Sequence, residues 1–370
     1  MGEAMNRDDL PEIKQALKDR IQELCRALLP DGRPIGRLYI AHNPVTLDHD
    51  KSPEFKVALN RDTGAWKDWR TGEKGDVIRL IEYVKGTDFA GAMQFARDFL
   101  GIRQMTAEER RRFTEESRAR VAAATVKAEK DQRHNREKGE ALFLEGLLDG
   151  AGSTAEHYAK RYFEGRGCPL FQVPNRDIAT MRYSAGTEYW KLADWKRHAD
   201  GRLEKLKAGP MLPAIHSAFR TATGQVVACH CTFLDPVEPI KARLGGDTAK
   251  LMRGEVQGAV IRISHGPEGL PPEEARRAFP LIIGEGIENS LSVAIAVPEA
   301  RVWAAGSLAN IGNCPVDLPC ISSVIVAIDN DWQNAQAQKQ LENGIRALAA
   351  KGKPVSIMAA HAGSDFNDMF

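Results

Sequence analysis

The sequence predicts an α/β protein of several domains, with mixed α+β units first and a Rossmann-like parallel sheet at the carboxyl end. Over residues 273–370, apolar strands alternate with helices across short connections, which is typical of a parallel sheet covered by helices on both faces. Upstream, hairpin-like strand pairs and separate helices are divided by a charged segment that is poor in glycine and proline. At 370 residues the chain is long enough for two or three compact units.

The first domain, residues 1–102, is expected to combine helices with a small sheet. Apolar residues recur at helical spacing from Ile13 to Leu28, so an amphipathic helix is predicted over residues 9–29. Short strands follow, with a hairpin turn at Asp62-Thr63-Gly64. The segments GEKGDVIRLIEYVKG and DFAGAMQFARDFLG then predict two helices, each ended by a glycine.

A charged helical linker is predicted for residues 103–150. The segment is rich in Arg, Lys, Glu and Ala, and its basic side chains outnumber the acidic ones. Such a helix can follow phosphates, or it can be a solvated spacer stabilised by i,i+4 ion pairs.

Two further domains are predicted after the linker. Residues 151–272 are expected to be mixed α/β, with the helix TAEHYAKRYFEGRG and a hairpin that turns at Thr223-Gly224. Residues 273–370 alternate the strand PLIIGEG, the helix IENSLSVAIAV, the strands RVWAAGS and ISSVIVAIDND, the helix NAQAQKQLENGIRALAAKG and the strand KPVSIMAA.

Composition narrows the class of protein. The formal net charge is +1, so a basic surface for nucleic acid has to be local. The six cysteines form no CxxC pair, which argues against a disulfide scaffold and against a zinc ribbon. No apolar run is long enough to span a bilayer and no signal-peptide pattern opens the chain, so we expect a cytoplasmic protein with no membrane partner.

Two other groups of residues invite a functional interpretation. If Cys229, His230 and Cys231 lie on one strand, the two thiols share a face and His230 points away, so one metal could not bind all three and buried thiols are favoured. A group of aromatic residues either stacks on bases or packs in a satellite core. Its members are Tyr183, Tyr189, Trp190 and Trp195.

Acidic residues follow two of the predicted parallel strands, at the edge where such sheets gather functional groups. Glu285 lies in Gly284-Glu285-Gly286, and Asp329 and Asp331 in Asp329-Asn330-Asp331 point to one side if the strand geometry persists. Three converging carboxylates repel one another unless a divalent cation neutralises them, and hard oxygen donors suit Mg²⁺ or Mn²⁺. A nucleotide-binding Rossmann fold is disfavoured because the chain has neither G-x-G-x-x-G at this turn nor a Walker lysine motif.

The segments GEGIENSLS, AIDND and SDFNDMF resemble the Toprim domain of primases from phages, plasmids and other mobile elements, in the lineage of the bacterial replicative primase. The resemblance covers residues 275–370 most clearly. It implies that Glu285 binds metal or helps to deprotonate the attacking hydroxyl, and that Asp329 and Asp331 bind metal. It further implies an additional acid at Asp365, with Asn367 and Asp368 nearby.

Upstream segments continue this resemblance. PAIHSAFRTATGQVVACHCTFLDP and KARLGGDTAKLMRG are similar to the subdomain that precedes Toprim in these primases and helps to hold template. The resemblance makes four basic residues candidates for phosphate contacts, with a solvated surface position as the alternative for each. They are Lys241, Arg243, Lys250 and Arg253.

The amino-terminal segment resembles the zinc ribbon that opens many primases, but every expected cysteine is missing. With only His42 and His49 nearby, a tetrahedral zinc site cannot be assembled, so no zinc is expected. We expect a metal-free remnant of the ribbon that Phe55, Trp66 and Trp69 hold together.

The resemblance implies a DNA primase that makes short RNA primers on single-stranded DNA from ribonucleotides with Mg²⁺ or Mn²⁺. No helicase module is recognisable, so a replicative helicase would act in trans. One alternative is a Toprim nuclease that uses the same acids, although such nucleases carry an ATPase. Another is a non-catalytic accessory protein that binds single-stranded DNA, which the lost zinc ligands favour.

Overall fold

The computed structural model describes residues 10–46, 53–59, 64–102, 107–198, 202–328 and 335–359. The chain divides into two compact units, Met1–Lys130 and Asp131–Phe370, which are described separately. None of the helices in these ranges has the length and apolarity to span a bilayer.

The first unit builds one antiparallel sheet and packs helices against it. The strands lie in the order β1-β2-β3-β4-β5. The strands are β1 (Arg33–Ile35), β2 (Leu38–Ala41), β3 (Phe55–Ala58), β4 (Trp66–Asp68) and β5 (Lys74–Gly75). The helices are α1 (Leu10–Asp19), α2 (Ile21–Leu28), α3 (Val77–Lys85) and α4 (Phe89–Phe99).

Local signals explain where the helices of this unit begin and end. Asp76 accepts hydrogen bonds from the backbone N–H groups of Ile78 and Arg79 at the start of α3, and Gly86 ends that helix at φ +61°. The single helix predicted over residues 9–29 is wrong in one respect. The chain breaks at Arg20, where φ −109° and ψ 25° interrupt the helix and divide it into α1 and α2.

The small sheet has an aromatic core, and two of the three aromatic residues predicted for it lie there. Phe55 and Trp66 are buried and stack with their ring centroids 4.9 Å apart, as expected. Trp69 is 56% exposed, so it does not hold the core together. It follows β4 on the solvent side, where the Lys67 ammonium lies 3.7 Å from the centre of its ring.

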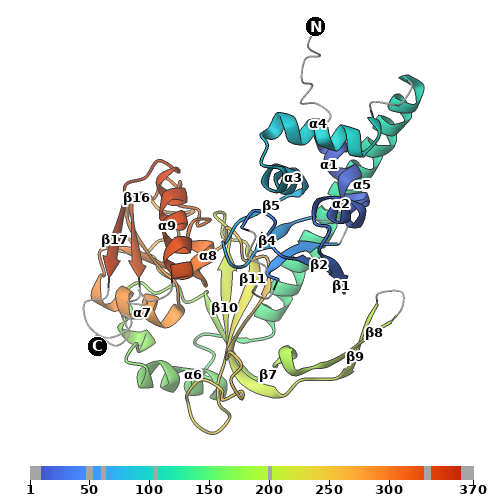
Figure 1. The fold of residues 1–370 in the computed structure, drawn as a ribbon. Helices are drawn as coiled ribbons and strands as arrows, with labels where there is room; N and C mark the ends of the chain where they lie inside the picture. The colour runs from blue at the N-terminus through green and yellow to red at the C-terminus, as the bar shows by residue number, and fades with distance from the viewer. Residues whose placement is uncertain are drawn as a thin grey trace. The chain divides into compact units, whose positions relative to one another are not determined.

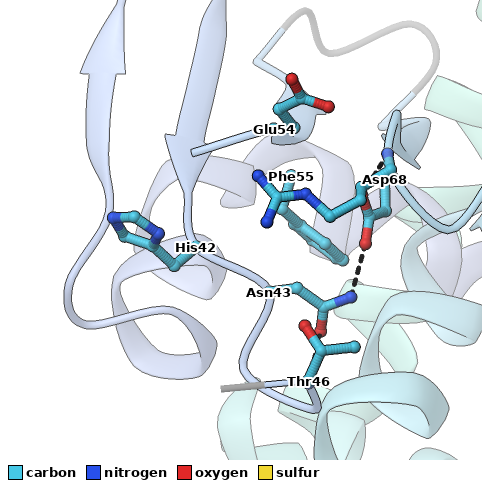
Figure 2. A pocket seen from close by; sticks show the side chains of 7 residues that line it. His42, Asn43, Thr46, Glu54, Phe55 and Asp68 are labelled. Carbon is cyan, nitrogen blue, oxygen red and sulfur yellow. Dashed lines mark hydrogen bonds between the residues drawn. The ribbon is translucent and has the colours of Figure 1, made fainter. Parts of the chain in front are cut away.

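A buried polar network joins the loop after β2 to the end of β4 and the turn that follows it. Asn43 donates to the Asp68 carboxylate at 2.5 Å and to the Tyr83 hydroxyl at 2.8 Å. Figure 2 shows the side chains of Asn43 and Asp68 facing each other. The Arg70 N–H and the Thr71 hydroxyl also donate to Asp68, at 2.8 and 3.0 Å. Burial acts to raise the pKa of Asp68, but these bonds outweigh it and hold the pKa below its usual range.

Helix α5 (Ala107–Leu144) confirms that the charged segment is helical. Ion pairs at i,i+4 spacing, such as Arg112 to Glu108 at 2.7 Å, lie along its exposed surface. Within the first unit, Arg120 pairs with Asp19 of α1 at 2.8 Å. Within the second unit its end packs on a sheet, where a Cβ at Gly139 would lie 2.7 Å from the Ala228 Cα.

The second unit contains an antiparallel sheet of order β12-β11-β10-β7-β6. The hairpin predicted at Thr223-Gly224 is confirmed, because β10 and β11 pair antiparallel and Gly224 turns at φ +82°. The elements are β6 (Leu147–Leu148), α6 (Thr154–Gly165), β7 (Met181–Glu188), β10 (Met211–Arg220), β11 (Val226–Phe233) and β12 (Lys250–Gly254). A separate hairpin, β8 (Asp194–Arg197) with β9 (Leu203–Lys207), stands between β7 and β10 in the chain.

The carboxyl-terminal sheet, of order β13-β15-β14-β16-β17, confirms the predicted α/β class. Four of its strands are parallel, and β13 joins β15 antiparallel. Helix α7 packs in one core with Ile282, while α8 and α9 pack with Leu281 and Ile283 in another, so helices cover both faces (Figure 1). The elements are β13 (Ile261–Ser264), β14 (Phe279–Gly284), α7 (Ile287–Ala296), β15 (Arg301–Ala304), α8 (Leu308–Ile311), β16 (Ile321–Ile328), α9 (Ala335–Ala349) and β17 (Val355–Ala359).

Candidate active site at the carboxyl end of the parallel sheet

Glu285 follows β14 directly and is half-buried at the carboxyl edge of the sheet. Its carbonyl oxygen accepts a hydrogen bond from the Gly306 N–H at 2.8 Å, and the carbonyl of Gly284 accepts from Ala305 N–H at 2.9 Å. These two hydrogen bonds hold the carboxyl end of β14 against the residues that follow β15. Gly306 is required there, because φ is +78° and a Cβ would lie 2.4 Å from the ring of Phe219.

Strand β16 runs parallel to β14 and brings its own carboxyl end to the same level. Ile283 is in register with Val326, so Glu285, two residues later, is level with Ile328 at the end of β16. The predicted acids Asp329, Asp331 and Asp365, with Asn367 and Asp368, lie outside the described residues. Within the described part of the chain, no three His, Cys, Asp or Glu side chains are grouped to hold a metal ion.

A buried carboxylate lies one turn beyond Glu285, at Glu288 in the first turn of α7. Its side chain is 6% exposed and accepts hydrogen bonds from the Tyr162 hydroxyl at 2.7 Å, the Lys241 ammonium at 2.9 Å and the Lys250 ammonium at 3.1 Å. Tyr162 comes from α6, Lys250 from β12 and Lys241 from the loop before it. The cluster therefore ties three distant stretches of chain to the start of α7.

The charges of this cluster shift several pKa values. Burial acts to raise the pKa of Glu288, but Lys250 and Lys241 outweigh it and hold the pKa far below its usual range. Burial, opposed by Glu288 and aided by Lys250, lowers the pKa of Lys241. Burial, with a contribution from Lys250, lowers the pKa of His230 to about 4, so this imidazole is neutral at pH 7.

The four basic residues that were predicted to contact phosphate have different surroundings. Lys241 and Lys250 meet on Glu288, and the Lys250 ammonium lies 4.0 Å from the Cβ position of Gly286, beside the glycine that follows Glu285. Arg243 pairs with Glu238 at 2.7 Å on the surface. The Arg253 guanidinium lies 4.5 Å from the centre of the Trp190 ring. Only the two lysines are brought together.

The structure also places the cysteine pair. Cys229 and Cys231 share a face of β11 with their sulfurs 3.7 Å apart, and both are buried. Their contacts lie in a core with Phe233, whereas the pKa of His230 responds to Lys250 and Glu288. The thiols and the imidazole thus point to opposite sides of the strand, as predicted.

The predicted aromatic group divides into two kinds of residue. Tyr183 and Tyr189 are fully buried, and Trp190 contacts Phe233 edge-on with ring centroids 5.9 Å apart. Trp195 is different, since it is 48% exposed on the β8–β9 hairpin.

Comparison with known families identifies the carboxyl-terminal part. Residues 280–370 match the Toprim domain family, and this range begins at β14 and includes Glu285. The chain carries a Toprim domain. Residues 137–263, which supply Lys241, Lys250 and Tyr162, match a domain of unknown function (DUF7146). No curated protein matches the chain.

Several solved structures are similar to the chain at low sequence identity. The zinc-binding and RNA polymerase domains of the Aquifex aeolicus primase are 14% identical, with a TM-score of 0.35 over 97% of this chain and 81% of that one. A DNA primase domain from Pseudomonas aeruginosa is 13% identical, with a TM-score of 0.41 over 62% and 72%. The E. coli primase catalytic core is 13% identical, with a TM-score of 0.39 over 59% and 69%. The Toprim assignment rests on the family match.

Proposed function

We propose that the protein is a DNA primase that joins ribonucleotides on a single-stranded DNA template at the carboxyl edge of its Toprim sheet. The observation that carries the proposal is the position of Glu285, at the end of β14 and level with the last described residue of β16. Asp329 is bonded to that residue, so its Cα is about 3.8 Å from the Cα of Ile328. Neighbouring strands are about 4.8 Å apart, so we expect the two acids at one edge of the sheet.

The donor set fits a hard divalent cation. Glu285, Asp329 and Asp331, with Asp365, offer carboxylate oxygens, which are the ligands that Mg²⁺ and Mn²⁺ prefer. When bound there, such an ion would lower the pKa of a primer 3′-hydroxyl and offset the charge that develops on the attacked α-phosphate.

The chain's own residues complete the site with positive charge. Lys250 lies beside the glycine that follows Glu285, and Lys241 meets it on Glu288, so the two lysines carry two charges against the one on Glu288. Because each ammonium has three donors and Glu288 accepts one from each, both lysines retain donors for phosphate oxygens. Arg243 and Arg253 are proposed to contact template phosphates.

The proposed division of labour follows the four predicted segments. Residues 273–370 carry the chemistry, residues 151–272 supply the two lysines, residues 103–150 connect, and residues 1–102 contact the template without zinc. A replicative helicase is proposed to act as a separate partner.

The test is primer synthesis from ribonucleotides on single-stranded DNA with Mg²⁺ or Mn²⁺. Asp329→Ala should abolish primers while circular dichroism shows an unchanged fold. The matched control is Asp317→Ala, an exposed acid of the same domain, which should retain synthesis. Undiminished synthesis by Asp329→Ala would reject the site. DNA cleavage without nucleotides would instead support a nuclease, and metal-independent DNA binding without incorporation would support an accessory protein.

A further inference from the structure

The β8–β9 hairpin has no core of its own. It forms a separate two-stranded sheet, and all four residues of β8 and all five of β9 are exposed. Figure 1 shows it as an arm that leaves the second unit beyond the end of β7. An isolated hairpin is marginally stable in water. The exposed side chains of the hairpin therefore add little to its stability unless they contact a binding partner.

The two faces of the hairpin differ in charge. Trp195 is paired with Lys205 across the strands, so both lie on one face, together with Arg197, which is two residues from Trp195 and is paired with Leu203. That face therefore carries two cations beside one aromatic ring. The register shifts between Asp194 and Trp195, and Lys207 is paired with Asp194 at the base of the hairpin. The opposite face carries Lys196 with the acid Glu204, which is its cross-strand partner.

Two cations of the hairpin have no ion pair within the described ranges. Lys205 is held by Glu188 at 2.7 Å and its ammonium lies 5.1 Å from the centre of the Trp195 ring. Neither Arg197 nor Lys207 is paired with an acid in the described part of the molecule. Both therefore remain available to a negatively charged partner beside an exposed indole.

We propose that this face binds single-stranded nucleic acid, with a base stacked on Trp195 and backbone phosphates on Arg197 and Lys207. An exposed indole, with the guanidinium of Arg197 on its face and the ammonium of Lys207 at the base of the hairpin, both unpaired among the described residues, matches what a single strand offers, which is flat bases along a line of negative charge. That the polyanion is a nucleic acid rests on the proposed function. The inference adds to it a contact surface outside the Toprim domain.

The competing explanations make different predictions. Trp195 and Lys205 could simply stabilise the hairpin as a cross-strand pair. The free strand edges could instead pair with a second copy of the chain. Variants that change the face without disturbing the cross-strand pair separate these explanations.

The experiment measures binding of a fluorescein-labelled single-stranded DNA to the full chain in EDTA, so that catalysis plays no part. Trp195→Ala should weaken binding by about 5- to 150-fold, the worth of one stacked base. The double variant Arg197→Ala/Lys207→Ala should flatten the slope of log K against log salt by about 1.4, as expected for two single-strand phosphates. Lys196→Ala, on the opposite face, is the matched control and should change affinity less than 2-fold.

The outcomes are decisive in both directions. Unchanged affinity and salt slope in the double variant, or an equal loss in Lys196→Ala, would overturn the proposal. So would a concentration-dependent dimer that Trp195→Ala abolishes while DNA binding persists. If the unaltered chain makes primers but the hairpin variants bind DNA as tightly as it does, the hairpin proposal alone fails. If the variants lose binding as expected but the unaltered chain makes no primers, the proposed function alone fails.

Discussion

Glu288→Gln is the substitution that most directly tests the buried cluster. The change preserves size and leaves an acceptor for the Tyr162 hydroxyl, but it removes the charge that Lys241 and Lys250 share. The two ammonium groups then face each other without a counter-charge. We expect a less stable second unit and lysines that are less well placed for phosphate.

The magnitude follows from the contacts. A hydrogen bond to a charged group contributes about 1.5–3 kcal/mol, and two such bonds are lost. The lysine side chains are 36% and 33% exposed, so water replaces part of that contribution. We expect a loss of about 2–3 kcal/mol, below the roughly 3–5 kcal/mol for breaking a fully buried pair. In a unit of this size that corresponds to roughly 5–10 °C in Tm.

The assay is calorimetry of the full chain at pH 7 and at lower pH. The folded pKa of Glu288 is depressed, so its contribution is present above the unfolded value of 4.5 and is lost as the pH falls below it. The Tm gap between the unaltered chain and Glu288→Gln should therefore narrow in acid. The control is Glu238→Gln, whose partner Arg243 is exposed, and it should cost about 0.5 kcal/mol or less. A Tm within 1 °C of the unaltered chain, or a gap independent of pH, would refute the reasoning.

Three further outcomes are expected. His230 is buried and its pKa is lowered from 6.5 to about 4, so the folded state binds fewer protons than the unfolded state. The free energy of unfolding should therefore drop by about 3 kcal/mol as the pH falls from 6.5 to 4. Urea titrations should show that this free energy depends less steeply on pH in His230→Gln, but not in the exposed control His157→Gln. Asp68→Ala should destabilise the first unit by about 2–4 kcal/mol, because it removes the acceptor of the buried Asn43 amide and of the half-buried Arg70 N–H and Thr71 hydroxyl. Limited proteolysis within residues 10–102 should then be faster than in the unaltered chain, and equal resistance would contradict this. Gly306→Ala should lower the free energy of unfolding by about 2–4 kcal/mol, because φ is positive there and the new Cβ would clash with a phenylalanine ring. Chemical denaturation measures this change, and a decrease under about 0.5 kcal/mol would show that the loop relaxes.

Features that local sequence encodes were predictable. The strand that precedes Glu285 is a short apolar run, and Gly224 and Gly86 end their elements at positive φ as their sequences suggest. The parallel sheet was predictable because alternation of strands and helices leaves few other arrangements. The break at Arg20 was not, since the apolar spacing continues through it.

Contacts between segments that are distant in the chain could not be predicted from the sequence. Glu288 stands within GEGIENSLS, yet nothing local shows that Lys241, Lys250 and Tyr162 reach it from far upstream. One signal was available. Helix α7 is apolar on nearly every side, and an acid in a helix that is buried all round requires a partner. The exposed position of Trp69 was likewise missed, because its place after β4 depends on how the turn leaves the sheet.

Strand β13 has a consequence for how this protein can be dissected. It lies before residue 273, yet it covers the outer edge of β15 in the carboxyl-terminal sheet. A fragment cut at the start of the Toprim match would leave that edge with unpaired backbone N–H and C=O groups, ready to pair with any other strand. A fragment that carries the carboxyl-terminal sheet alone should therefore begin upstream of Ile261. In a shorter fragment, aggregation through the open edge would be mistaken for a lack of activity.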